Sequence, residues 1–173
     1  MQCSVYIAAS LDGYIARSDG GIDWLSIVDR AGEDYGYQSF HQSVDTVVVG
    51  RSTYNLALGF DPWPYAGKRC VVLTHAPPAP RHGEEFYSGS PRELCDRLAE
   101  QGATRVYVDG GAVIQQFLSA GLVTDLTVSF VPVLLGEGVR LFGNTGGDLP
   151  LELARTKSFP SGLVQVQYRV LAR

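Results

Sequence analysis

Residues 105–121 read RVYVDGGAVIQQFLSAG and contain a short strand, a glycine pair and a helix in direct succession. Residues 105–108 form a short Val- and Tyr-rich run, which is typical of a strand covered on both faces. In the segment 111–120, apolar residues recur at the spacing of one helix face, and Gly121 predicts where that helix ends. In open α/β sheets, ligands bind beyond the carboxyl ends of the strands, at junctions of this kind.

The same order occurs at residues 46–58, where a TVVV strand (Thr46–Val49) runs through Gly50 into a short helix over Ser52–Leu58. A further helix at Ser90–Gln101 begins with the Ser-Pro-Arg-Glu pattern of a capping box. The remaining predicted elements are strands at Ser4–Ala9, Arg69–Thr74 and Thr124–Val133, a helix at Asp29–Gln42, and a closing hairpin of Leu151–Phe159 and Leu163–Leu171. Because polar and apolar residues alternate over 163–171, one face of the last strand is expected to be polar.

These elements predict one α/β domain over residues 1–173. We expect a three-layer α/β/α arrangement with a mostly parallel central sheet and an antiparallel C-terminal edge. A chain of this length holds one domain of ordinary size, and it buries enough surface for a stable core without disulfides.

The composition argues against several classes of protein and partner. Hydrophobic residues make up 45% of the chain and charged residues 18%, which excludes intrinsic disorder. The net charge of −4 argues against nucleic acid or an anionic membrane as a partner. No signal peptide, membrane span or metal site is predicted, and Cys3, Cys70 and Cys95 are expected to be free and buried. A soluble cytoplasmic protein is the expectation.

The chain holds 20 glycines, against about 12 at average usage, and several of them follow predicted strands. Three such strand ends, residues 49–53, 73–75 and 108–112, combine glycines, hydroxyls and the Arg51 guanidinium. Backbone N–H groups at such junctions bind anions, so the three together predict a shared nucleotide cleft. The alternative is that these glycines serve only the turns. Neither a G-x-G-x-x-G fingerprint nor a P-loop is present.

Four motifs carry a resemblance to a known family: residues 8–16 (AASLDGYIA), 49–53 (VGRST), 109–111 (DGG) and 116–118 (QFL). In this order they resemble the dihydrofolate reductase-like superfamily over essentially the whole chain. Ser10-Leu11-Asp12-Gly13 with Ile15-Ala16, together with residues 121–126 (GLVTDL) and 132–136 (PVLLG), is most similar to the reductase domain of bifunctional riboflavin-biosynthesis proteins and to its stand-alone relatives.

The resemblance implies NADPH as the cofactor. Arg51 would meet the 2′-phosphate of the adenosine, where its guanidinium donates charge-assisted hydrogen bonds. The loop Ala16–Trp24 would form a mobile cover. The residues implied to contact the cofactor are Ala9, Ile15, Gly50, Arg51, Ser52, Thr53, Thr74, His75, Gly110, Gly111, Ala112 and Val113.

The resemblance and the side-chain chemistry together place Asp12 and Asp29 as candidate catalytic groups, and Trp24, Ser129 and Glu137 as candidate substrate contacts. Each has a structural alternative. Asp29 could be the N-cap of the following helix, and Glu137 a solvated turn residue. Trp24 and Ser129 could belong to the core.

The expected activity is that of an NADPH-dependent reductase acting on 5-amino-6-(5-phosphoribosylamino)uracil. Departures from the family pattern keep other functions open: Lys68 stands where dihydrofolate reductases place an Arg, and Asp61-Pro62 is shorter than the riboflavin-type Asp-Asp-Pro. The alternatives are reduction of a pterin or other small heterocycle, NADPH binding without catalysis, and phosphate binding unrelated to redox chemistry. Relatives pair through their C-terminal strands, so the resemblance implies a homodimer.

Overall fold

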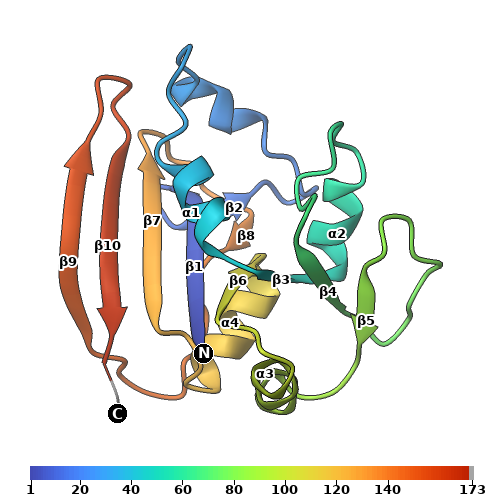
Figure 1. Cartoon of the computed structure of the whole chain (residues 1–173). Helices are drawn as coiled ribbons and strands as arrows, with labels where there is room; N and C mark the ends of the chain where they lie inside the picture. Colours follow the sequence, from blue (N-terminus) through green and yellow to red (C-terminus); the bar gives the residue numbers. More distant parts are fainter. Residues whose placement is uncertain (172–173) are drawn as a thin grey trace.

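The computed structural model describes residues 1–171, and the last two residues of the predicted domain, 172–173, lie outside the described residues. An eight-stranded sheet has the order β5-β4-β3-β6-β1-β7-β10-β9 (Figure 1). Its strands are β1 Gln2–Ser10, β3 Thr46–Gly50, β4 Arg69–Leu73, β5 Glu85–Tyr87, β6 Arg105–Asp109, β7 Asp125–Val131, β9 Leu151–Ser158 and β10 Val164–Val170. A small second sheet pairs β2 (Tyr14–Ala16) with β8 (Val139–Arg140).

Every strand pair from β5 to β7 is parallel, and β10 pairs antiparallel with both β7 and β9. The carboxyl ends of β3 and β6 therefore lie side by side, with Val49 opposite Asp109. This arrangement confirms the predicted α/β fold with an antiparallel C-terminal edge. It also brings the strand ends at Gly50 and Asp109 to the same edge of the sheet.

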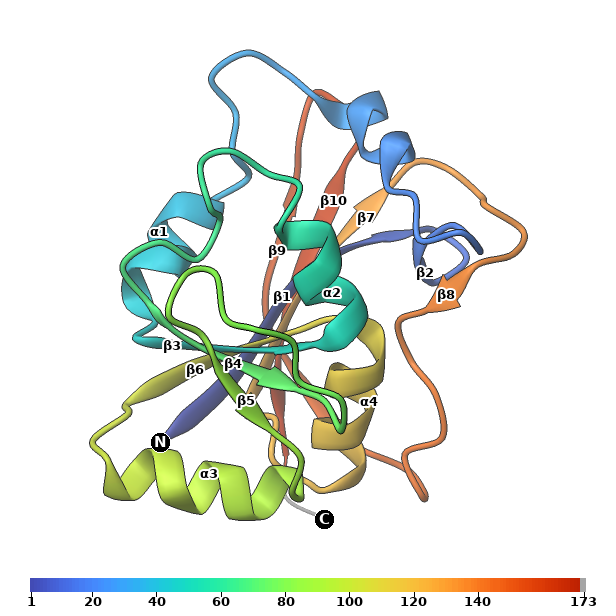
Figure 2. The same ribbon diagram turned by 90° about the vertical axis from the view of Figure 1, so that its right-hand side faces the viewer.

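Helices cover both faces of the parallel part of the sheet (Figure 2). Alternate residues of β3 show why: Val47 and Val49 pack with α1 (Tyr37–Ser43) and α2 (Arg51–Ala57), whereas Val48 packs with α3 (Pro91–Glu100) and α4 (Gly111–Ser119). Side chains of successive strand residues point to opposite faces, so a strand covered on both sides must be apolar throughout. All three layers of the predicted architecture are present.

Local sequence signals set the ends of α3. The Ser90 hydroxyl accepts a hydrogen bond from the Glu93 amide, and the Glu93 carboxylate accepts one from the Ser90 amide. This reciprocal pair is the capping box that the sequence predicted, with Pro91 at the first helical position.

The predicted helix at Asp29–Gln42 is wrong in its first half, whereas its second half is present as α1. A 3₁₀ helix, η1, occupies Asp23–Val28, and α1 begins only at Tyr37. Gly32, Tyr35 and Gly36 have positive φ angles of 77°, 59° and 90°, and a right-handed helix cannot pass through such residues. The Asp34 carboxylate, two residues before the N-cap Gly36, accepts hydrogen bonds from the amides of Gly36 and Gln38 and so satisfies one amide of the first turn of α1.

The cysteines are free and buried, as predicted. Cys3 on β1 and Cys95 on α3 lie together, with 3.7 Å between their sulfur atoms. Within residues 1–171, none of the helices has both the length and the apolar character needed to cross a membrane.

Candidate functional site

A cleft of about 680 Å³ opens at the carboxyl ends of β3 and β6, between the first turns of α2 and α4. Both strand–glycine–helix junctions line it, together with β2 and the loop that follows β2. The cleft brings together most of the residues that the resemblance implied to contact the cofactor: Ile15, Gly50, Arg51, Ser52, Thr53, Gly110, Gly111, Ala112 and Val113.

The glycines let the two junctions approach each other closely. A Cβ atom on Gly110 would lie 2.2 Å from Thr53 Oγ1, and Gly110 has a φ angle of +91°. A Cβ atom on Gly111 would lie 3.0 Å from both the Arg140 carbonyl oxygen and Ile15 Cδ1. Any larger residue would fill the floor of the cleft, so these two glycines are required by close packing as well as by turn geometry.

The first turn of α4 faces this cleft through Gly111, Ala112 and Val113. Among the described residues, no side chain caps this helix. The first N–H groups of a helix lack intrahelical acceptors and carry the positive end of the helix dipole. They fit a pyrophosphate or another anion, because a bare glycine surface beneath them allows close approach.

Arg51 connects the cleft to the predicted strand end at residues 73–75. Its Nε donates to Asn55 Oδ1 over 3.0 Å, and its Nη1 donates to the Ala76 carbonyl over 2.7 Å. Thr74 and His75 precede this carbonyl but do not line the cleft; the Thr74 hydroxyl accepts a bond from the Ala76 amide, and His75 is exposed. The guanidinium retains unused donors at the cleft wall.

Of two further expectations, that Ala9 contacts the cofactor and that Ala16–Trp24 covers it, only the second segment lies at the cleft. Ala9 is fully buried near the end of β1 and does not line the cleft. The segment Ala16–Trp24, in contrast, lies over the cleft and contributes Ala16, Ser18, Asp19 and Gly20 to its wall. The segment is held by an ion pair in which Arg17 Nε lies 2.7 Å from Asp23 Oδ1.

Asp109 belongs to the 109–111 motif, but the sequence reasoning gave its carboxyl group no role. It lies at the end of β6, directly before the glycine pair, and its Oδ1 accepts a hydrogen bond from the Gly110 amide over 2.8 Å. Burial raises the pKa of its carboxyl group, although bonds from Gly110, Tyr65 and Tyr107 oppose this shift. The signal was in the sequence: an acidic residue directly follows the buried run Val106–Val108.

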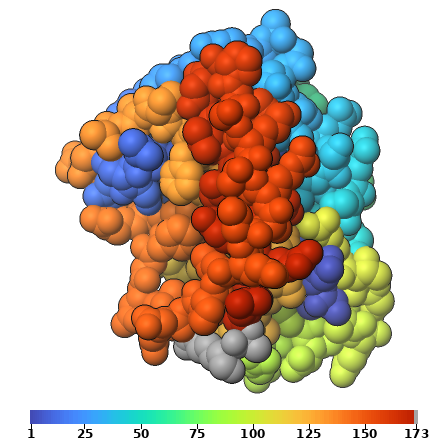
Figure 3. All heavy atoms as spheres, turned by 90° about the vertical axis from the view of Figure 1, so that its left-hand side faces the viewer, coloured from blue at the N-terminus to red at the C-terminus, as the bar shows by residue number. Residues whose placement is uncertain are grey.

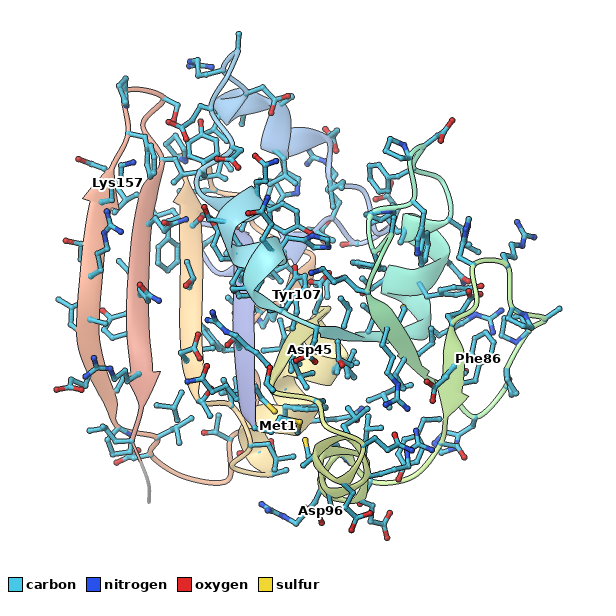
Figure 4. All side chains as sticks on the ribbon, viewed as in Figure 1. Met1, Asp45, Phe86, Asp96, Tyr107 and Lys157 are labelled. Atoms are coloured by element: carbon cyan, nitrogen blue, oxygen red, sulfur yellow. The ribbon has the colours of Figure 1, made fainter. Side chains whose placement is uncertain are left out.

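Tyrosines surround this carboxyl group. The Tyr65 hydroxyl donates to Asp109 Oδ2 over 3.2 Å, and burial together with the nearby Asp109 raises the pKa of Tyr37 to about 12. Tyr107 lies two residues earlier on the same strand, and Figure 4 shows it to the right of β1 near α1. Burial raises the pKa of Tyr107 well above its usual value. Asp109 does not line the cleft, but behind Gly110 it provides a carboxyl group that can remain protonated above the ordinary pKa of an aspartate.

Comparison with known proteins now identifies the family. The model of the RibD C-terminal domain matches residues 3–165. This chain belongs to the RibD C-terminal domain family. YwjB, an uncharacterized protein of Bacillus subtilis (strain 168), is 36% identical over 167 residues, which cover 95% of each chain.

Solved structures agree with this membership. A candidate riboflavin biosynthesis protein from Shewanella sp. PV-4 superimposes with a TM-score of 0.92 at 33% identity, covering 99% of this chain and 100% of that one. Dihydrofolate reductase from Enterococcus faecalis, complexed with NADP(H), gives a TM-score of 0.69 at 18% identity, covering 98% and 96%. The latter likeness shows the dihydrofolate reductase-like fold.

In this RibD-type domain, Asp12 holds two loops together. Its carboxylate accepts hydrogen bonds from the Ser10 hydroxyl (2.6 Å), the Gly136 amide (2.7 Å) and the Leu135 amide (3.1 Å). The Ser10 bond, helped by the two amides, lowers the pKa of Asp12 to about 2. The group is therefore ionised at neutral pH and anchors the β1–β2 turn to residues 135–136.

The structure places Asp29 and Glu137 on the surface. Asp29 follows η1 and is exposed, and because α1 begins eight residues later, its alternative role as the N-cap of that helix is wrong. Glu137 is exposed in the loop between β7 and β8. Neither residue lines the cleft.

Trp24 and Ser129 are buried beside the C-terminal strands. Trp24 is only 2% exposed and packs with Val131 and Phe159. The Ser129 hydroxyl accepts a hydrogen bond from Gln165 Nε2 over 2.9 Å. Neither residue lines the cleft, so the surroundings of both match the core alternatives.

Proposed function

We propose that this chain is an NADPH-dependent reductase of a small heterocycle, of the riboflavin-biosynthesis type. The observation that carries this proposal is the cleft in which Gly110 and Gly111 open the floor beneath the first turn of α4. Family membership supports the same activity. When bound, NADPH supplies a hydride, and the protein supplies binding, orientation and exclusion of water.

Each wall of the cleft has a distinct role in this proposal. The N–H groups that begin α4 bind the pyrophosphate, as Gly111 leaves room for it. Arg51 binds the 2′-phosphate, because a guanidinium recognises phosphate oxygens with paired donors. Ile15 and the loop over residues 16–20 cover the cleft and keep water away from the reacting atoms.

We assign the proton donor to Asp109, which does not line the cleft itself but directly precedes Gly110 in its floor. Reduction of an imine-like carbon leaves negative charge on the neighbouring nitrogen, and a protonated carboxyl group can neutralise it. Asp109 ends the strand that leads into Gly110, and burial favours its neutral form. We assign Asp12 to positioning, because its pKa of about 2 leaves it ionised, with no proton to donate, and its oxygens fix residues 135–136.

The heterocycle we propose is 5-amino-6-(5-phosphoribosylamino)uracil. A pterin fits less well, because Asp29, the carboxylate that would hold it, is exposed and does not line the cleft. The test follows NADPH oxidation by its absorbance with this phosphoribosylamino-uracil and, separately, with dihydrofolate. Turnover of the uracil alone supports the proposal. Turnover of dihydrofolate alone, or NADPH binding with no turnover of either, contradicts it.

We also propose that the chain forms a homodimer through its C-terminal hairpin. All eight residues of the edge strand β9 are exposed, among them Leu153 with 55% of its surface accessible. Figure 3 views the molecule from the side of β9 and shows the hairpin running down the middle of that face. A long exposed edge strand with apolar side chains is an unusual feature in a monomer, and pairing with a second copy would cover it.

A further inference from the structure

The polar face of the C-terminal hairpin carries a second hollow. Strand register places Gln167 of β10 between Thr127 of β7 and Arg155 of β9, and the next row likewise contains Ser129, Gln165 and Lys157. Among the described elements, no helix lies in front of β10 and β9, whereas α1 lies in front of β1 (Figure 1). This is the polar face that the alternation over residues 163–171 predicted.

A cavity of about 400 Å³ lies between α1 and this face. Its size is at the lower end of the range of small-molecule sites. The α1 side is formed by Phe40, whose ring stacks on Tyr6 with 4.7 Å between centroids. None of its lining residues also lines the cleft between α2 and α4, so the two sites are separate.

The cavity is positively charged in a negatively charged protein. Arg105, Arg155 and Lys157 line it, and no aspartate or glutamate does. Arg105 is paired with Asp125 at 3.3 Å. Within residues 1–171, Arg155 has no hydrogen-bonding or ionic partner, and Lys157 contacts only the Phe159 ring, with Nζ 4.2 Å from the ring centroid. Figure 4 shows Lys157 on β9, at the open side of the sheet.

Hydrogen bonds hold Gln165, in the sheet wall of the cavity, in place. Gln165 Nε2 lies 2.9 Å from Tyr6 Oη, 2.9 Å from Ser129 Oγ and 3.1 Å from the Tyr35 carbonyl oxygen. These bonds fix the amide group in the wall. A binding site whose polar groups are held in place loses less entropy when a ligand binds.

We propose that this cavity binds an oxyanion, a phosphate or carboxylate group of a small polar molecule. Arg155 and Lys157 neutralise the anion, while the Gln167 amide and the Thr127 hydroxyl serve the polar remainder of the molecule. The aromatic pair of Tyr6 and Phe40 gives the ligand a flat surface on the α1 side. The site is independent of the proposed cofactor cleft.

The test uses side-chain amide signals of Gln165 and Gln167 in ¹H–¹⁵N NMR spectra. The full chain is titrated with inorganic phosphate, glucose 6-phosphate and citrate in separate arms at constant ionic strength, which distinguishes phosphate from carboxylate. The variants are R155Q/K157Q and, as a control on the neighbouring strand, R169Q. Arg169 is exposed, pairs with Glu152 and does not line the cavity.

We expect saturable shifts of these amides with at least one probe. The apparent Kd should rise at least tenfold in R155Q/K157Q and less than twofold in R169Q, while both variants keep the NADPH affinity of the wild type. Two results would overturn the proposal: no saturable shift with any probe, or equal shifts in R155Q/K157Q.

Discussion

Tyr65 donates a hydrogen bond to Asp109, with 3.2 Å between Tyr65 Oη and Asp109 Oδ2. The bond joins the segment between α2 and β4 to the end of β6, beside the glycine pair. Burial raises the pKa of Asp109, while this bond lowers it. The protonation state of Asp109 is thus set by burial on one side and by the hydrogen bonds from Gly110, Tyr65 and Tyr107 on the other.

Asp109→Asn should lower kcat by about 10²–10⁴-fold, the usual contribution of a general acid. Because the wild type acts in the protonated form, its rate should fall as pH rises through the raised pKa of Asp109. This limb of the pH profile should be absent from the variant. Asp96→Asn is the control, since Asp96 is exposed on α3, which Figure 4 shows at the lower edge of the molecule, and does not line the cleft.

Tyr65→Phe tests the same pair without removing the carboxyl group. The variant loses a hydrogen bond that lowers the pKa of Asp109, so the descending limb should move to higher pH. A limb that stays in place, with only kcat changed, would show that Tyr65 does not tune Asp109.

Gly110→Ala and Gly102→Ala separate backbone strain from packing. Both glycines have φ near +90°, but only at Gly110 would a Cβ atom meet another group, Thr53 Oγ1 at 2.2 Å. Each variant should lose about 1–2 kcal/mol of stability from its φ angle. Only Gly110→Ala should lose more in denaturant titrations and also weaken NADPH binding. Equal effects in both variants would show that Gly110 serves only a turn.

Glu84→Gln tests how much a buried carboxylate outside the cleft contributes to the stability of the fold. Glu84 accepts bonds from Tyr54 Oη and from the amides of Arg81 and His82, both at 2.7 Å. Glutamine would present an NH₂ group to one of these donors, so the variant should lose about 1.5–3 kcal/mol of unfolding free energy at pH 7. Glu100→Gln, on the exposed end of α3, should change it little.

The stability effect of Glu84 should depend on pH. Burial alone would raise the pKa of Glu84, but the bonds from Tyr54 and the two amides outweigh it and lower the pKa from 4.5 to about 2. The ionised group therefore stabilises the fold above pH 4.5, and this contribution is lost as pH falls toward 2. The difference between wild type and Glu84→Gln should shrink over this interval; a constant difference would contradict the assignment.

Leu153→Glu tests the proposed homodimer. A charge in the middle of β9 should oppose pairing of two copies, so light scattering after gel filtration should give a dimer for the wild type and a monomer for the variant. Leu134→Glu changes a leucine that is more exposed than Leu153 and lies in the loop after β7, and this variant should remain dimeric. A monomeric wild type would overturn the proposal.

The sequence predicted most of the sheet, because each central strand is a short apolar run between turn residues, as in Thr46–Val49. It failed between Asp29 and Tyr37, where positive φ angles at Tyr35 and two glycines end any helix. No clear sequence signal predicts a tyrosine with a positive φ angle. At Tyr35 this conformation occurs together with two long-range hydrogen bonds: the Tyr35 hydroxyl donates to Ser161, and the Tyr6 hydroxyl donates to the Tyr35 carbonyl.

The candidate site was predicted in part for a related reason. Strand–glycine–helix junctions are local patterns, so Gly50 and Gly110 were found from sequence and come together in one cleft. Roles that depend on distant partners were not visible. The three hydrogen bonds that fix Asp12 include two from residues 135–136. The protonation of Asp109 depends on burial, which favours the neutral form, and on bonds such as that from Tyr65, which oppose it.

Cofactor binding is the central claim, and calorimetric titration of NADPH and NADH into the wild type and Arg51→Ala tests it most directly. The wild type should bind NADPH more tightly than NADH. Arg51→Ala should raise the Kd for NADPH about tenfold or more, the loss of charge-assisted bonds to one phosphate, and leave the Kd for NADH within twofold. Absence of NADPH binding by the wild type, or equal weakening of both nucleotides in Arg51→Ala, would contradict the account.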